Sequence, residues 1–284
     1  MPTPLCNALY VVSTPIGNLD DLSIRAIEVL KTVDAIACED KRHSSRLLRH
    51  HSVENTLLAY HEHSGPRDAD AILARLGNGE SIALISDAGT PLVADPGYKL
   101  VNQVVDSGFD VIAIPGASAM LAALAVSGLA TDRFAFEGFL PARQEAREKR
   151  LSALQAEPRT LVFYETPHRI LETLQAMSRI LGEDRKIVLA RELTKRFETK
   201  LRGDLASVTQ QVTDDSDQRR GEFVLMVTGH KDLVEAGEVP KEARQVLSVL
   251  MQELPLKQAS SLAAKITGVK KNALYKWGLT ESGA

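Results

Sequence analysis

The chain has 284 residues, a net charge of −3, 44% hydrophobic residues and 25% charged residues. This composition is ordinary for a globular protein, and no apolar run approaches the roughly 20 residues that a membrane-spanning helix needs. Two cysteines, Cys6 and Cys38, are too few for a disulfide framework or a four-cysteine zinc site and indicate a reducing compartment. The start, Met1-Pro2-Thr3-Pro4, lacks the basic flank and apolar core of a signal peptide, so we expect a cytoplasmic protein.

Strands and helices alternate through the first 128 residues. Short apolar runs predict strands at residues 9–12, 35–38, 57–60, 82–85 and 111–114. Amphipathic or small-residue segments predict helices between and after them, at residues 20–31, 44–50, 66–76, 98–105 and 120–126. This alternation predicts an α/β domain over residues 1–128, with a mostly parallel sheet that helices cover on both faces.

The same pattern restarts after Gly128. Strands are expected at residues 134–136, 160–164, 186–190 and 223–227, and helices at 143–155 and 170–181. We therefore expect a second α/β domain over residues 129–234, with a mostly parallel or mixed sheet. A linker is expected at Glu235–Pro240.

Residues 240–284 predict a small helical unit with helices at 243–253, 256–266 and 270–277. Ala264, Gly268 and Leu274 have the spacing of the small residue, turn glycine and core residue of a helix-turn-helix. The unit carries seven basic and three acidic residues, whereas the rest of the chain has a net charge of −7. A basic tail on an acidic body indicates an anionic partner such as nucleic acid. A helical lid or a dimer contact is the alternative.

Turn residues and polar residues follow the predicted strands. The most prominent stretch is Ser86–Gly97, which comes directly after an apolar run. Similar loops stand at residues 14–18, 115–119, 164–169, 191–195 and 221–222. If the sheets are parallel, these loops converge on a cleft between the two domains, where ligands commonly bind. The alternative is that they are ordinary connections.

Several familiar phosphate-binding and hydrolytic motifs are absent from the sequence. It contains no Walker loop, no His-Glu-x-x-His and no Gly-x-Ser-x-Gly, and only Gly17 stands where a dinucleotide fingerprint needs three glycines. This favours a ligand held by backbone groups and apolar walls, such as an adenosine moiety without a polyphosphate. His61-Glu62-His63 has no evident third ligand, so we expect solvated loop histidines and no metal site.

At this point a family resemblance emerges. Residues 10–19 (Tyr-Val-Val-Ser-Thr-Pro-Ile-Gly-Asn-Leu) and the Ser86–Gly97 stretch resemble the tetrapyrrole-methylase superfamily, the class III S-adenosylmethionine methyltransferases. Residues 39–43, 138–141, 163–169, 190–194 and 268–275 are similar to its branch of small-subunit ribosomal RNA methyltransferases. The resemblance covers nearly the whole chain. It implies methylation of a ribose 2′-hydroxyl, that of a cytidine in the decoding region of 16S ribosomal RNA.

The resemblance also implies a homodimer and S-adenosylmethionine bound in the cleft between the α/β domains. The implied cofactor-binding residues are Pro15, Gly17, Asp87, Ala88, Gly89, Thr90, Pro115, Ser118, Ala119, Tyr164 and Leu193. Tetrapyrrole enzymes have a longer glycine-rich loop where Pro15 and Gly17 stand, so this loop is where the chain departs from the family pattern.

A ribose hydroxyl is a weak acid, so a proton acceptor would help the transfer. The first candidates are Asp40 and His61, and the second candidates are Glu39 and Glu192. The candidate RNA-binding residues are Arg42, His43, Arg169, Lys195, Lys270 and Lys271. A structural ion pair or a surface charge cluster is the alternative for each of them. Two other functions remain open: a tetrapyrrole or other small-molecule methyltransferase, and a non-enzymatic nucleotide-binding regulator.

Overall fold

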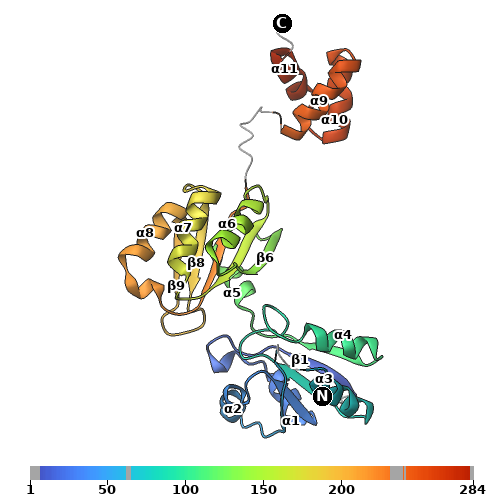
Figure 1. Cartoon of the computed structure of the whole chain (residues 1–284), viewed down its shortest axis with the longest axis vertical. Helices are drawn as coiled ribbons and strands as arrows, with labels where there is room; N and C mark the ends of the chain where they lie inside the picture. The colour runs from blue at the N-terminus through green and yellow to red at the C-terminus, as the bar shows by residue number, and fades with distance from the viewer. Residues whose placement is uncertain (1–6, 62–64, 231–238, 240, 282–284) are drawn as a thin grey trace. The chain divides into compact units, whose positions relative to one another are not determined.

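The computed structural model describes residues 7–61, 65–230, 239 and 241–281 (Figure 1). The residue contacts divide the chain into two units, Met1–Gly229 and His230–Ala284. Over the described residues, the larger unit contains two five-stranded sheets and the smaller unit contains three helices.

The first sheet is parallel throughout, as the alternation of strands and helices predicts. Its strands are β1 (Ala8–Val12), β2 (Ala35–Cys38), β3 (Leu57–Ala59), β4 (Ile82–Ile85) and β5 (Asp110–Ile114). Their order is β3-β2-β4-β1-β5. Because helices cover both faces of this sheet, its central strands are continuous apolar runs rather than alternating ones.

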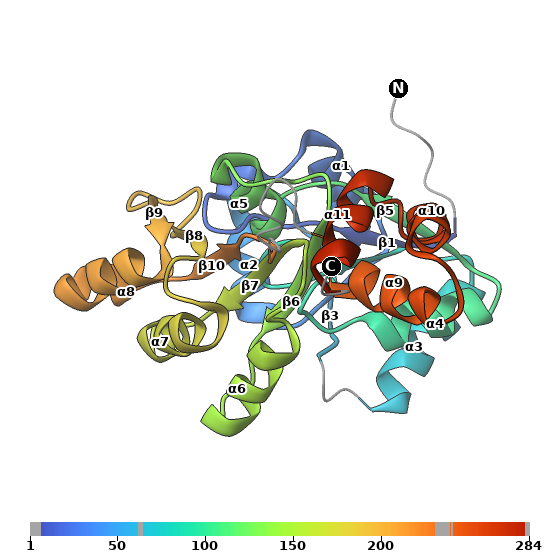
Figure 2. The ribbon, with the colours of Figure 1, turned by 90° about the horizontal axis from the view of Figure 1, so that it is seen from above.

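Four helices form those two covering layers. A 3-10 turn (Leu19–Asp21) precedes α1 (Ile24–Thr32), and α2 (Lys41–His50), α3 (Pro66–Gly77) and α4 (Tyr98–Asp106) follow the next strands. One buried cluster joins α1 and α2 to Tyr10 and Ile85, and another joins α3 and α4 to Leu9 and Leu84. Figure 2 shows α1 on one side of β1, and α3 and α4 on the other.

The second sheet is mixed. Its strands are β6 (Phe134–Phe139), β7 (Thr160–Glu165), β8 (Lys186–Arg191), β9 (Thr199–Asp204) and β10 (Phe223–Val227), in the order β6-β7-β10-β8-β9. Only β6 and β7 pair in parallel, and the other three neighbouring pairs are antiparallel. The expectation of a mixed sheet is confirmed, whereas a mostly parallel arrangement is wrong for this half.

Two elements of the second half have no counterpart in the sequence analysis. They are β9 and α8 (Leu205–Asp214), which a 3-10 turn at Ser216–Arg219 follows. The sequence of β9, Thr-Lys-Leu-Arg-Gly-Asp, contains a single large apolar residue because β9 lies at the edge of the sheet. Gly138 and Phe139, expected in a loop, extend β6 beyond a register shift after Phe136.

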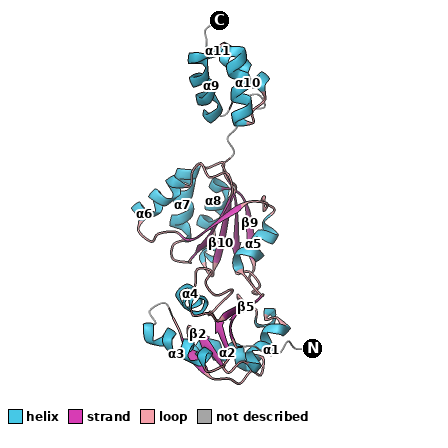
Figure 3. Ribbon diagram, turned by 90° about the vertical axis from the view of Figure 1, so that its right-hand side faces the viewer, coloured by secondary structure: helices cyan, strands magenta, loops and turns pink. Residues whose placement is uncertain are grey.

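The second sheet also carries helices on both faces. Its first face packs against α6 (Gln144–Ala153), α7 (Ile170–Leu181) and α8, and its second face packs against α5 (Ala119–Ser127) (Figure 3). In α5, Ala123 and Leu124 share a buried cluster with Val162, Val188 and Val224. A helix expected in the first domain therefore covers the second sheet. The domain boundary at residues 128/129 stays a prediction.

The antiparallel direction of β10 matters for the site. Its first residue, Phe223, is paired with Glu165 and Arg191, the last residues of β7 and β8. The preceding pair, Gly221–Glu222, therefore lies beside the carboxyl ends of both neighbours. A parallel β10 would have placed Gly221–Glu222 at the opposite edge of the sheet.

The smaller unit consists of α9 (Lys241–Glu253), α10 (Leu256–Thr267) and α11 (Lys271–Glu281). Its buried residues are Val239, Ala243, Leu247, Ala259, Ala263 and Leu274. Gly268 has a φ of +73° and ends α10, as expected of a turn glycine. The fully buried small residue is Ala263, whereas the neighbouring Ala264 is only partly buried. Of the linker expected at residues 235–240, only Val239 is described, and it packs into this core.

Candidate active site

Hydrogen bonds fasten together the loops that follow β1, β4 and β5. Thr14 and Gly89 exchange two backbone hydrogen bonds with N–O distances of 2.8 and 3.0 Å. The Thr14 hydroxyl donates to the Ser86 carbonyl at 3.1 Å, and the Thr90 hydroxyl donates to the Ala117 carbonyl at 3.2 Å. Gly89 has a φ of +84°, which a residue with a Cβ adopts only at a cost. These contacts join the three loops into one rigid edge of the first sheet.

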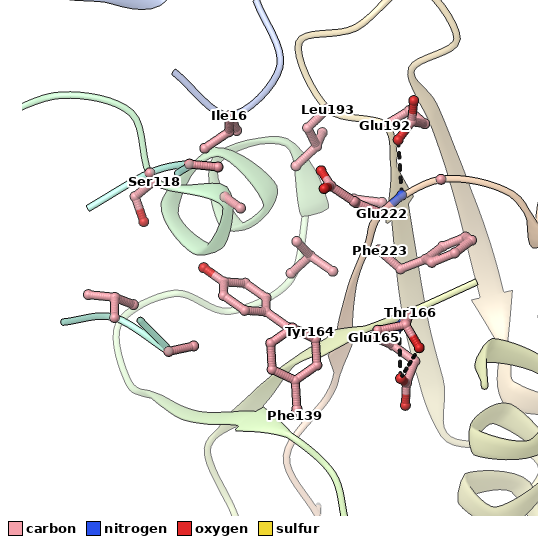
Figure 4. A pocket seen from close by; sticks show the side chains of 18 of the residues that line it. Ile16, Ser118, Phe139, Tyr164, Glu165, Thr166, Glu192, Leu193, Glu222 and Phe223 are labelled. Carbon is pink, nitrogen blue, oxygen red and sulfur yellow. Dashed lines mark hydrogen bonds between the residues drawn. The ribbon is translucent and has the colours of Figure 1, made fainter. Parts of the chain in front are cut away.

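A pocket of about 610 Å³ lies between this edge and the second sheet (Figure 4). This volume is within the usual range for small-molecule and cofactor sites. The walls are largely apolar and include Ile16, Val93, Ala119, Phe139, Tyr164, Leu193, Phe223 and Val224. We call this cavity the larger pocket.

Aromatic side chains form one wall of the larger pocket. The Tyr164 ring lies 4.9 Å from the Phe136 ring and 5.7 Å from the Phe139 ring, and Figure 4 shows Tyr164 and Phe139 together. The backbone N–H of Met120 donates to the Tyr164 hydroxyl oxygen at 3.2 Å. Burial raises the pKa of Tyr164, so its hydroxyl stays neutral at physiological pH. Tyr164 therefore offers this pocket a neutral, flat surface.

One buried carboxylate at the pocket has all its named hydrogen-bond and ion-pair partners inside the fold. Glu165 is fully buried and accepts hydrogen bonds from the Thr166 N–H at 2.8 Å and the Thr173 hydroxyl at 2.6 Å. Arg169 donates to Glu165 at 3.3 Å and to the Leu140 carbonyl at 2.5 Å. The Arg169 guanidinium is therefore engaged in contacts within the fold.

A cluster of three charged side chains, Glu192, Lys195 and Glu222, links the loop after β8 to the start of β10. The Lys195 ammonium lies 2.9 Å from a Glu192 oxygen and 2.8 Å from a Glu222 oxygen. The Glu222 N–H also donates to Glu192 at 2.9 Å, as Figure 4 shows. Burial alone would raise the pKa of Glu192, but these hydrogen bonds lower it overall. Burial alone would lower the pKa of Lys195, but its two carboxylate partners raise it overall. Glu192 and Lys195 are therefore ionised at neutral pH.

Strained backbone is concentrated beside the larger pocket. Among the described residues, five non-glycine residues have positive φ: Ser52, Leu92, Ala94, Glu192 and Thr194. All but Ser52 belong to the two loops that follow β4 and β8. Such conformations cost about 1–3 kcal/mol each and persist where the surroundings hold them in place. This clustering makes the two loops candidates for a functional role.

A smaller pocket of about 310 Å³ lies next to the larger one. Its lining residues are Pro15, Ile16, Gly17, Leu19, His43, Arg46, Leu47, Asp87, Ala88, Lys195 and Glu222. Gly17 packs tightly against Lys195, because a Cβ on Gly17 would lie 2.5 Å from two carbons of the Lys195 side chain. A side chain at position 17 would push Lys195 away from its present position, so this close approach favours glycine.

The structure brings most of the predicted cofactor residues to these two pockets. The larger pocket is lined by Ala88, Gly89, Thr90, Ser118, Ala119, Tyr164 and Leu193. The smaller pocket is lined by Pro15, Gly17, Asp87 and again Ala88. Pro115 lines neither of the two. The cofactor-binding roles of these residues stay predictions.

The four candidate proton acceptors differ in their position relative to the two pockets. Glu192 lines the larger pocket, whereas Asp40, His61 and Glu39 line neither pocket. Asp40 caps α2: one of its carboxylate oxygens accepts from the Arg42 N–H at 2.7 Å and the His43 N–H at 3.3 Å. These hydrogen bonds lower the pKa of Asp40, and the pKa of Glu192 is lowered as well, so position rather than basicity distinguishes the two. The geometry therefore favours Glu192.

The candidate RNA-binding residues lie in four different settings. His43 and Lys195 line the smaller pocket, and Arg42 is exposed on α2. Arg169 is engaged inside the fold. In the smaller unit, Lys270 and Lys271 are exposed at the start of α11. Their contacts with RNA stay predictions.

Sequence reasoning missed several pocket residues. Asp95 lies within the Ser86–Gly97 stretch and lines the larger pocket, and burial raises the pKa of its carboxyl. Glu222 lines both pockets, and Arg46 lines the smaller one. Asp95 and Glu222 both belong to loops that were expected at the cleft, although neither residue was given a role. Arg46 depends on which face of α2 is buried, which the sequence did not indicate.

Over residues 7–61, 65–230, 239 and 241–281, no group of three or more His, Cys, Asp and Glu side chains is arranged to hold a metal ion. Glu62 and His63 lie outside the described residues. None of the described helices has the length and apolar composition needed to cross a membrane.

Both units of the chain match known protein families. Residues 8–209 match the Tetrapyrrole (Corrin/Porphyrin) Methylases, and residues 237–282 match the RsmI C-terminal HTH domain. These matches agree with the expected α/β body and helix-turn-helix tail.

Full-length relatives are also similar. The ribosomal RNA small subunit methyltransferase I of Escherichia coli O157:H7 is 50% identical over 275 residues, which cover 97% of this chain and 96% of that protein. The protein of the same name from Pseudomonas aeruginosa PAO1 is 51% identical, covering 97% of this chain and 98% of that protein. Among solved structures, a uroporphyrin-III C-methyltransferase from Thermus thermophilus in complex with S-adenosylhomocysteine has a TM-score of 0.54 at 18% identity. That match covers 78% of this chain and 97% of that one, and at this identity it supports the fold alone.

Proposed function

Since the chain belongs to the tetrapyrrole (corrin/porphyrin) methylase family, and within it to the ribosomal RNA small subunit methyltransferases I, we propose that it methylates small-subunit ribosomal RNA with S-adenosylmethionine as methyl donor. The observation that carries this proposal is the 50–51% identity over 97% of the chain, which spans both the α/β body and the helical tail. A likeness of the α/β body alone would fit a tetrapyrrole methyltransferase equally well.

The residues of the larger pocket suit this cofactor. Its volume of about 610 Å³ accommodates a nucleoside with an amino-acid side arm, and its apolar walls suit an adenine ring. The carboxyl groups of Asp95, Glu192 and Glu222 suit a cation, and the cofactor carries a positive sulfonium and an ammonium group. Thr90, Ser118 and Ala119 would hold it from the first-sheet side, and Tyr164 and Leu193 from the second-sheet side.

When bound, S-adenosylmethionine supplies a methyl group on a positively charged sulfur that leaves as a neutral thioether. The acceptor would be a ribose 2′-oxygen, that of a cytidine in the decoding region of 16S ribosomal RNA. Because the leaving group is good, positioning contributes most of the acceleration. The rigid edge made by Thr14, Gly89 and Thr90 would fix the donor side of the reaction.

The chain's own contribution to the chemistry is proton removal. Glu192 is ionised at neutral pH and lines the pocket, so its carboxylate can accept the 2′-hydroxyl proton as the new carbon–oxygen bond forms. Lys195 would hold Glu192 and Glu222 in place and stabilise negative charge on the attacking oxygen.

We further propose a homodimer that acts in the cytoplasm, where ribosomal subunits are assembled. Large apolar side chains are exposed on two helices of the body, with Tyr98 and Val105 on α4 and Leu121 on α5. They are candidates for burial against a second copy. Sedimentation of the purified chain should give twice the chain mass, and a concentration-independent monomer would contradict this part of the proposal.

The proposed function is tested by methyl transfer from labelled cofactor to three acceptors: purified small ribosomal subunits, free small-subunit RNA and uroporphyrinogen. Label in RNA supports the proposal, whether it enters the subunit or the free RNA. Label in uroporphyrinogen alone would establish the tetrapyrrole alternative. No transfer to any acceptor, together with cofactor binding, would favour a nucleotide-binding regulator.

The role of the tail has its own test. Phosphate contacts by Lys270 and Lys271 should make RNA affinity sensitive to salt. Deleting residues 240–284 should weaken RNA binding and leave cofactor binding unchanged. RNA affinity that survives the deletion would assign RNA docking to the α/β body alone.

A further inference from the structure

The two pockets share a wall. Ile16, Ala88, Lys195 and Glu222 line both the larger and the smaller pocket. A group bound in the smaller pocket would therefore contact some of the same residues as a ligand in the larger one. Two reactants held in such adjoining cavities can meet at the residues that the cavities share.

The surroundings of the pockets differ in charge. In the larger pocket, the carboxyl groups of Asp95, Glu192 and Glu222 face a single lining cation, Lys195, and a fourth lining carboxylate, Glu165, is paired with Arg169. The smaller pocket has two carboxyl groups, those of Asp87 and Glu222, and is bounded on one side by α2, whose sequence Lys-Arg-His-Ser-Ser-Arg-Leu-Leu-Arg-His contains no acidic residue. Among the described residues, the only ion pair of α2 joins His50 to Asp20, at the far end of the helix from the pocket. The basic groups near the pocket thus remain available to an anion.

The basic face of α2 is held firmly against the smaller pocket. His43, Arg46 and Leu47 line it, which is the i, i+3, i+4 spacing of one helix face. Leu47 and its neighbour Leu48 anchor the helix in the core of the first sheet. The N–H of Asp40, which caps the helix, donates to the Asp87 carboxylate at 3.3 Å. Arg46 is exposed, so its guanidinium can reach a ligand without losing an internal partner.

From these observations we propose that the smaller pocket is the acceptor-nucleotide subsite. It would take the ribose and base of the nucleotide that is methylated, and Arg46 with His43 would contact the adjoining RNA phosphates. Charge complementarity assigns the cationic cofactor to the larger pocket and the anionic RNA to the α2 side. The ribose hydroxyl would then lie at the shared wall, beside Lys195 and Glu222. This inference rests on the proposed function, because it presumes an RNA acceptor.

The test is an Arg46→Ala variant of the full chain, with Arg49→Ala as its matched control. Arg49 is on the same helix and equally basic, but it lines neither pocket, and its side chain donates to the Ser45 carbonyl at 3.1 Å. For each variant we would measure the KM for small ribosomal subunits or their RNA, its salt dependence, and the Kd for S-adenosylmethionine.

Arg46→Ala should raise the KM for RNA about tenfold, the loss expected for one charge-assisted hydrogen bond. The slope of log affinity against log salt should fall by about 1 for the lost phosphate contact. Arg46→Glu should have a larger effect, and Arg49→Ala should change the KM less than about twofold. The cofactor Kd should stay unchanged in all three variants, which also shows that they are folded.

Three results would overturn the inference. Equal effects of Arg46→Ala and Arg49→Ala would mean that only the general charge of α2 matters. A weakened cofactor Kd in Arg46→Ala would make the smaller pocket part of the cofactor site. An unchanged KM in Arg46→Ala and Arg46→Glu would exclude a phosphate contact. If the wild-type chain transfers no methyl group to RNA, the proposed function itself fails, and the inference with it.

Discussion

The two sides of the larger pocket are built in different ways. On the first-sheet side, small residues and backbone hydrogen bonds fix the loops, as the paired N–H and C=O groups of Thr14 and Gly89 illustrate. On the second-sheet side, charged side chains fix the loops, through Glu165 with Arg169 and through Lys195 with Glu192 and Glu222. The difference suggests a division of labour in which backbone walls set the shape for the cofactor and the charged side handles protons and charge.

The largest effect should come from Glu192→Gln on the charged side. Removing the proton acceptor should lower the single-turnover methylation rate by about a thousandfold, within the range for general bases. Cofactor affinity should fall far less than the rate, because Asp95 and Glu222 keep their carboxyl groups and glutamine keeps an oxygen that can accept from the Glu222 N–H. The comparison variant is Asp40→Asn, since asparagine also caps helices well and removes only the charge. We expect near wild-type rates for Asp40→Asn; the reverse ranking would make Asp40 the base.

Arg169→Leu should be the most damaging change for stability. It leaves the fully buried Glu165 carboxylate without its ion-pair partner, which typically costs about 3–5 kcal/mol. The control is Arg179→Leu in α7, the helix that Arg169 precedes, because the pair of Arg179 with Glu148 is partly exposed and should contribute far less. Urea unfolding measures both. Similar losses in the two variants would show that Glu165 does not need Arg169.

A smaller effect is expected from Gly89→Ala on the backbone side. The positive φ of Gly89 should cost alanine about 1–2 kcal/mol, and the strain should weaken cofactor binding about tenfold. Gly128→Ala is the control, because Gly128 also has positive φ but ends α5 with open space around its Cβ position. Calorimetric titration should show weaker cofactor binding only for Gly89→Ala. Equal affinities would mean that the edge does not shape the cofactor site.

The smallest effect concerns the pH dependence of Asp95→Asn. Burial raises the pKa of Asp95 in the folded chain, so the unfolded chain loses this proton first as pH rises. Asp95 therefore contributes no penalty below its unfolded pKa, and a growing penalty as pH rises through its folded pKa. Without cofactor, the melting temperature of Asp95→Asn relative to wild type should increase from pH 3 to pH 7, by at most about 2 °C. A decrease over this range would mean that ionised Asp95 stabilises the fold.

The sequence predicts the first half of the body well because its strands are buried on both faces and separated by helices. The loops that follow β1, β4 and β5 converge as parallel strands require, so Gly89, Thr90 and Ser118 reach the pocket they were expected to line. The second half is harder because β9 is a polar edge strand, and because nothing local distinguishes an antiparallel β10 from a parallel one. Gly221–Glu222 was expected in the cleft on the assumption of a parallel sheet. The pair does lie at the cleft, but it does so because β10 is antiparallel to its neighbours.

Charged residues show the limit of sequence reasoning more sharply. Arg169 and Asp40 have the chemistry of an anion clamp and a base, but the fold engages the first with Glu165 and uses the second to cap α2. Their partners are set by tertiary contacts and by local turn geometry that a strand-end pattern does not reveal. Arg46 was overlooked for the opposite reason, since a basic residue within a helix normally indicates only a solvated surface.

The most direct test of the account is to locate the transferred methyl group. Small ribosomal subunits are incubated with the chain and S-adenosylmethionine, the RNA is digested to nucleosides, and the products are identified by mass spectrometry. We expect one additional 2′-O-methylcytidine per subunit, formed about a thousandfold more slowly by the Glu192→Gln variant. A methyl group on a base, or RNA that stays unmodified while a small tetrapyrrole is methylated, would contradict it.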